Sequence, residues 1–118
     1  MELKTQSDLI PTARKDGDFV FATVHGEIDL HNSPDLRGAL LSILTQAQPK
    51  KLVLNLNAVP YMDSSAIAVF VESLQKLRKT GGKLYLTNLQ PRVKGLLEIA
   101  RLDSIFVICA DENEAMKK

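Results

Sequence analysis

The feature that most constrains the fold of this chain is an alternation of short apolar runs with longer stretches of helical periodicity. Residues 52–56, LVLNL, form an almost wholly apolar run, which suits a strand covered on both faces of a sheet. In residues 64–79 the apolar side chains return at helical spacing, at Ile67, Phe70, Val71, Leu74 and Leu77. Strands that alternate with helices predict an α/β fold, with a partly parallel sheet and helices packed on it.

Other segments extend this pattern along the chain. We expect further strands at residues 19–24, 84–86 and 105–109, with a turn at 16–18 before the first of them. Residues 1–13 look extended and poorly patterned. Because the first strands follow each other without an intervening helix, we predict a mixed sheet of four to five strands.

Helix signals lie between these strands. Ser33 is the predicted N-cap of a helix with Pro34 at its first position, and Pro49 ends that helix. Pro91 opens another helix, and Asp111 begins a short one. The predicted buried faces of the first two are Leu36, Leu40, Leu44 and Ala47, and Val93, Leu96, Leu97 and Ala100.

Length and composition limit the class of function. A chain of 118 residues buries about two-thirds of its unfolded surface, so we expect one domain over residues 1–118. A net charge of +1 argues against nucleic-acid binding through a basic face. Cys109 is the one cysteine, which excludes an internal disulfide, and we interpret it as a small core residue. The scattered cysteine and histidines form no zinc pattern, and no glycine-rich phosphate cradle appears, so we expect neither metal nor cofactor.

The N-terminal residues contain no apolar stretch that resembles a signal peptide. No segment approaches the ~20 apolar residues of a membrane span. We therefore expect a soluble cytoplasmic protein without membrane insertion.

Three polar residues, Asp63, Ser64 and Ser65, stand between the central strand and the helix at 64–79. Asp and Ser are usual helix caps, and capping alone is the simplest interpretation. A helix N-terminus also carries unsatisfied N–H groups and a partial positive charge, which favour a phosphate there. The next turn, residues 66–69, is apolar nearly all round, so we expect a small exposed apolar patch that suits docking.

Five short motifs occur in order at regular spacings, and together they resemble bacterial anti-sigma factor antagonists of the STAS domain family over most of the chain. The motifs are Gly26-Glu27-Ile28-Asp29, Leu52-Val53-Leu54-Asn55-Leu56, Tyr61-Met62-Asp63-Ser64-Ser65, Gly81-Gly82-Lys83-Leu84, and Pro91-Arg92-Val93 with Leu102. The resemblance implies a STAS fold and a regulated binding protein rather than an enzyme.

The resemblance also implies a phosphorylation switch. The family's modified serine directly follows the Asp, which is Ser64 here. The first implied partner is an anti-sigma factor that is a GHKL-type serine kinase. The unphosphorylated antagonist binds this kinase, and a sigma factor is thereby freed. The second implied partner is a PP2C-type phosphatase that removes the phosphate.

Several residues near Ser64 have two open interpretations. Asp63 either caps the helix or positions the Ser64 hydroxyl, and Asp29 either shapes the site or satisfies loop N–H groups. We interpret Ser65 as a hydrogen-bonding neighbour rather than the acceptor of the phosphate. Met62 and Tyr61 either face the partner or cover the sheet edge. The predicted partner contacts are Glu27, Met62, Ala66, Ile67 and Ala68.

One departure from the family pattern is plain. The family usually has Gly-Leu-Gly after the serines, where this chain has Ala66-Ile67-Ala68. Glycine costs up to ~1 kcal/mol relative to alanine inside a helix, so we expect a stiffer helix start here.

Three alternative functions are weighed against the switch. A non-switching STAS adaptor subunit of a membrane lipid-transport or signalling complex would use the same fold. A serine hydrolase is disfavoured because Ser64 lacks the Gly-x-Ser-x-Gly elbow. A nucleotide sensor is disfavoured because Gly81-Gly82 stands alone.

Overall fold

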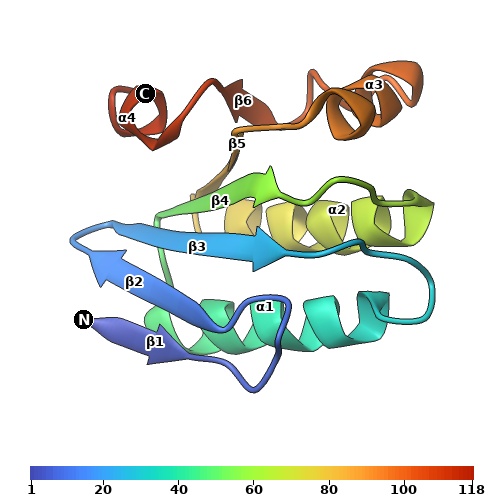
Figure 1. Cartoon of the computed structure of the whole chain (residues 1–118). Coiled ribbons are helices and arrows are strands. Elements are labelled where there is room, and N and C mark those ends of the chain that lie inside the picture. The colour runs from blue at the N-terminus through green and yellow to red at the C-terminus, as the bar shows by residue number, and fades with distance from the viewer.

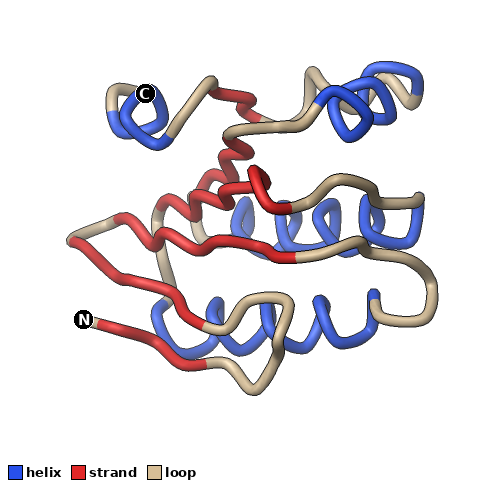
Figure 2. The backbone as a smooth tube through the Cα atoms, viewed as in Figure 1, coloured by secondary structure: helices blue, strands red, loops and turns tan.

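The computed structural model describes all residues, 1–118, and contains a six-stranded mixed sheet whose strands lie side by side in chain order (Figure 2). The first three strands are antiparallel, and the last four run parallel to one another. The strands are β1 (Glu2–Lys4), β2 (Thr12–Asp16), β3 (Phe19–His25), β4 (Lys51–Ala58), β5 (Lys83–Thr87) and β6 (Val107–Cys109).

Four helices complete the fold: α1 (Ser33–Ala47), α2 (Ser64–Lys79), α3 (Pro91–Ile99) and α4 (Glu112–Met116). Figure 1 shows α1 and α2 side by side against one face of the sheet, with their first turns at the same edge. The short α4 contacts β4, β5 and β6. No helix has the length and apolar character needed to cross a membrane.

The apolar run of β4 is explained by cover on both faces of the sheet. Leu52, Leu54 and Leu56 belong to the main core of 29 buried residues, which also takes in the inner faces of α1, α2 and α3. Val53 points the other way, into a cluster of five buried residues that includes Tyr85, Cys109 and Ala115 of α4. The predicted α/β sheet with packed helices is therefore confirmed.

The predicted strand count was too low, because the sheet has six strands rather than four to five. The two strands missed in residues 1–16 are the polar segments ELK and TARKD, and Leu3 and Ala13 are their only buried residues. An edge strand with one face in solvent needs few apolar side chains, so its pattern in the sequence is weak.

Three further local predictions are corrected. The N-cap of α1 is Asn32, while Ser33 is the first helical residue and is buried. The last strand begins at Val107 rather than Ile105, because the preceding residues form a turn that buries Phe106 in the main core. Ala100 is the C-cap of α3 and is exposed, so it does not belong to the buried face of that helix.

Cys109 is buried in the smaller core cluster, as its apolar surroundings in the sequence predict. Burial raises the pKa of its thiol, because the charged thiolate loses its hydration there. A thiol with a raised pKa is a weaker nucleophile at neutral pH, which fits a packing role.

Gly82 supplies a close approach between the end of α2 and the start of β4. A Cβ at this position would lie 3.0 Å from both Leu77 Cδ2 and the backbone oxygen of Lys50. We expect Gly82→Ala to lower the free energy of unfolding by about 1–3 kcal/mol, since the carbonyl group cannot move aside freely. Gly38→Ala is the matched control, because Gly38 lies inside α1 with open space around it, and should raise stability by up to about 1 kcal/mol. Urea unfolding of both variants measures the difference, and equal effects would contradict the packing argument.

Candidate functional site

The candidate site lies at the edge of the sheet where the loops after β3 and β4 meet, on the right in Figure 1. Beyond the ends of the two strands, Ile28 and Met62 form a further parallel bridge. The Ile28 N–H donates to the Tyr61 carbonyl at 3.1 Å, and the Asp63 N–H donates to the Ile28 carbonyl at 3.1 Å. Ile28 and Met62 are both buried in the main core, so this bridge joins the two loops to each other and to the core.

Asp63 caps α2 and also reaches across to the other loop. Its Oδ1 accepts hydrogen bonds from the backbone N–H of Ser65 at 2.9 Å and from the Ser65 hydroxyl. Its Oδ2 accepts from the backbone N–H of Leu30 at 3.1 Å. The bond from the Ser65 hydroxyl is the largest cause that lowers the pKa of the Asp63 carboxyl below its usual 3.8. Of the two interpretations of Asp63, the geometry supports the cap, because the carboxylate is directed at Ser65 and Leu30 rather than at Ser64.

Ser64 is exposed at the first position of α2. The first turn of this helix contains no acidic residue, and the Asp63 carboxylate at the N-cap lies against its first N–H groups. Ser65 is only partly exposed, and its hydroxyl is engaged by Asp63. Ser64 is therefore the serine of the pair whose hydroxyl is open to a second protein.

Asp29 shapes the loop after β3. Its Oδ1 accepts from the backbone N–H groups of His31 at 2.9 Å and Asn32 at 3.2 Å. The Asn32 side chain in turn accepts from the Asp29 N–H at 2.8 Å and donates to the Glu27 carbonyl at 2.9 Å. These bonds support the interpretation of Asp29 as a residue that satisfies loop N–H groups, and they leave the Glu27 side chain exposed.

The predicted apolar patch on the first turn of α2 needs correction. Met62, Ala66 and Ile67 are 1%, 0% and 6% exposed, and all three side chains belong to the main core. Within residues 66–69, the stretch predicted to form the patch, Ala68 alone is exposed. The first turn faces the sheet with most of its apolar side chains, so only Ala68 and Glu27 of the predicted contact set are accessible.

The same geometry locates the two alanines that replace the usual glycines. The Ala66 methyl group is packed inside the core, and the Ala68 methyl group faces solvent. A single methyl group is therefore added to the accessible surface beside Ser64.

Near the site, Leu30 and Arg92 were not predicted from the sequence, whereas Tyr61 was given two open interpretations. Leu30 is 76% exposed in the loop after β3, and Tyr61 is 37% exposed in the loop after β4. The guanidinium of Arg92, on the first turn of α3, lies 4.9 Å from the centre of the Tyr61 ring. A leucine between Asp29 and His31 in a predicted loop was a usable signal, whereas nothing local in the sequence links Arg92 to Tyr61.

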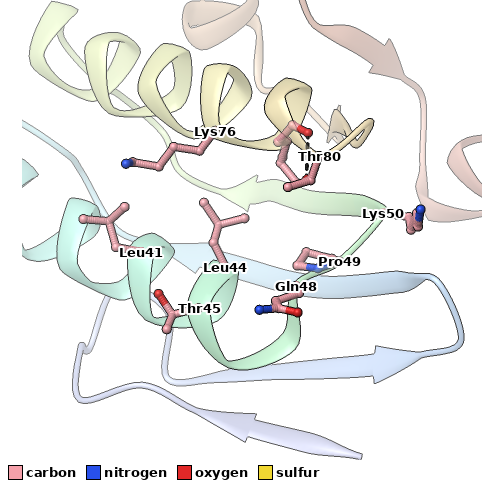
Figure 3. Close-up of a pocket in the computed structure, with 9 residues that line it drawn as sticks. Leu41, Leu44, Thr45, Gln48, Pro49, Lys50, Lys76 and Thr80 are labelled. Carbon is pink, nitrogen blue, oxygen red and sulfur yellow. Dashed lines mark hydrogen bonds between the residues drawn. The ribbon is translucent and has the colours of Figure 1, made fainter.

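A separate cleft of about 500 Å³ opens between the C-terminal halves of α1 and α2 (Figure 3). Lys76 lies there, about 18 Å along the helix axis from Ser64 at ~1.5 Å per residue. The cleft is thus distinct from the edge that carries Ser64, and its lining residues are Leu41, Leu44, Thr45, Gln48, Pro49, Lys50, Lys76, Leu77 and Thr80.

Comparison with known proteins shows which family this chain matches. A family model described as the STAS domain matches residues 10–115. The anti-sigma-B factor antagonist of Bacillus subtilis (strain 168) is 37% identical over 87 residues, which are 74% of this chain and 78% of that protein.

Solved structures show the same fold. An anti-sigma factor antagonist from Mycobacterium paratuberculosis superposes with a TM-score of 0.80 at 24% identity, covering 98% of this chain and 97% of that one. The Bacillus cell fate determinant SpoIIAA in its phosphorylated form superposes with a TM-score of 0.67 at 18% identity, covering 89% and 96%. At these identities the likeness establishes the shared fold.

The Asp63 carboxylate gives a test of the site by pH. Because its pKa is lowered in the folded chain, its charge stabilises the fold fully above about pH 4, and this contribution is lost as the pH falls through the lowered pKa. We expect Asp63→Asn to be less stable than the wild type at pH 7, and we expect the difference to shrink below pH 3.8. Urea unfolding of both proteins between pH 2 and pH 7 measures it, and a difference that is constant with pH would contradict a role for the charge.

Proposed function

Because this chain belongs to the STAS domain family, we propose that it is an anti-sigma factor antagonist, which binds an anti-sigma factor in its unphosphorylated form and thereby frees a sigma factor. The name of the Bacillus subtilis relative supports this function. The observation that carries the proposal is the exposed Ser64 at the first position of α2, beside a carboxylate that is engaged elsewhere.

Ser64 is the proposed switch. Its kinase is the anti-sigma factor itself, a GHKL-type ATPase, and a PP2C-type phosphatase resets it. In this proposal the chain is a cytoplasmic substrate and binding protein rather than an enzyme. Support comes from the surroundings of Ser64, because the Asp63 carboxylate is turned toward Ser65 and Leu30 and leaves the Ser64 hydroxyl exposed.

A phosphate on Ser64 would act mainly at the interface. It adds about −1.5 to −2 charge and would take the net charge from +1 to about −1. The helix N-terminus favours an anion, so the fold should tolerate the group. A partner that covers Ser64 would have to desolvate that charge, and only about 1.4 kcal/mol is needed for each tenfold loss of affinity.

The first test is the intact mass of the protein after incubation with Mg-ATP and the anti-sigma factor kinase encoded by the same genome. We expect the wild type to gain one phosphate. Ser64→Ala should gain none, and Ser65→Ala should still be modified, because Ser65 serves as a hydrogen-bonding neighbour.

The outcomes of this test are distinct. A phosphate gained by Ser64→Ala but lost in Ser65→Ala would move the switch to Ser65. Stable binding without any phosphate gain would identify a non-switching adaptor.

A charge at position 64 should mimic the modified state. We expect Ser64→Glu to bind the anti-sigma factor at least tenfold more weakly than the wild type, measured by titration calorimetry. Gln75→Glu is the matched control, because it places the same charge on an exposed position of the same helix, and its affinity should stay within twofold. Equal losses in both variants would indicate a general charge effect rather than a switch at Ser64.

A further inference from the structure

Leu30 is an unusual feature of the edge that carries Ser64. It is a large apolar side chain with 76% of its surface exposed, whereas Ile28, the other large apolar residue of this loop, is buried. Tyr61, by comparison, is 37% exposed and has the Arg92 guanidinium over its ring. Leu30 is therefore the larger uncovered apolar contact at this edge.

The loop cannot easily turn Leu30 inward, because its backbone is fixed on both sides. On the N-terminal side, the Ile28 bridge to Met62 is anchored in the core. On the C-terminal side, Asp29 and Asn32 bond to each other's backbone and side-chain groups. The backbone that carries this exposed side chain is fixed before a partner binds, which reduces the entropy cost of ordering the loop on association.

The loop and the turn that carries Ser64 form one unit. The Leu30 N–H donates to Asp63 Oδ2 at 3.1 Å, and Asp63 directly precedes Ser64. A partner surface of standard size covers about 800 Å² on each protein, a disc of roughly 16 Å radius. A footprint of that size centred on Ser64 therefore also covers Leu30.

We infer that Leu30 is the apolar anchor with which this protein binds its anti-sigma factor, and that the anchor is held beside Ser64 by the Asp63 carboxylate. The inference rests on the proposed function and adds the residue that supplies affinity. Energetically dominant interface residues lie near the centre of the contact, and an apolar side chain on an ordered loop beside Ser64 can take that position. Ile99 is more exposed, at 85%, but it ends α3 and takes no part in the hydrogen bonds that join the two loops.

The test compares Leu30→Ala with Met116→Ala by titration calorimetry against the anti-sigma factor kinase of the same genome. Met116 is also an exposed apolar side chain, 47% accessible, but it lies on α4, away from the loops that carry the site (Figure 1). We expect Leu30→Ala to weaken binding at least tenfold and Met116→Ala to stay within twofold. Leu30→Met should restore the affinity to within threefold, because methionine supplies similar apolar volume.

Each result decides a separate point. If the wild type binds and Ser64→Glu weakens binding, while Leu30→Ala binds within twofold of the wild type, the proposed function stands and the inference about Leu30 is overturned. Equal losses in Leu30→Ala and Met116→Ala also overturn it. If the wild type binds no anti-sigma factor kinase of that genome, the proposed function and the inference fall together. Thermal unfolding of each variant verifies that the fold is intact.

Discussion

The backbone pairing of Ile28 with Met62 is the contact on which the geometry of the site depends. It continues the parallel pairing of β3 and β4 beyond the strands, with a register that shifts after Thr23 and again after His25. Both side chains are buried, so the pairing is secured by the core as well as by its hydrogen bonds. Without it, the loop after β3 and the turn before α2 would be two separate surface loops, and the Leu30 N–H could not meet the Asp63 carboxylate.

The central part of the fold was predictable because its signals are local. Helix α2 begins and ends at the residues that periodicity and capping indicate, and Asp63 is the cap. The apolar run at 52–56 is too short for a typical helix, so its length favours a strand. Its nearly continuous apolar character fits a strand that is covered on both faces. The same local signals predict Ser64 at the N-terminus of this helix, where the structure places it.

The remainder depends on contacts between residues far apart in the chain. Residues 2–4 and 12–16 become strands only because β3 offers them an edge, and their own sequence is mostly polar. The helical periodicity of α2 already includes Ile67 in its apolar stripe. The burial of Ala66 depends on how the first turn of α2 packs on the sheet, which periodicity does not specify. The Leu30–Asp63 bond and the Arg92–Tyr61 contact each join segments about thirty residues apart, at distances of 3.1 Å and 4.9 Å that no local pattern specifies.

The alanines after the serines favour recognition by a preformed surface. Ala66 fills the core beneath the first turn, where a glycine would leave the helix start freer to move. The Asp63 cap and the Ile28–Met62 bridge restrain the backbone of the same turn. Because the backbone of this turn is restrained, a phosphate on Ser64 would change its conformation little. The effect of the phosphate would therefore be on partner binding. In the proposed switch, a phosphate on Ser64 would therefore change the charge and bulk of a preformed surface rather than the fold beneath it.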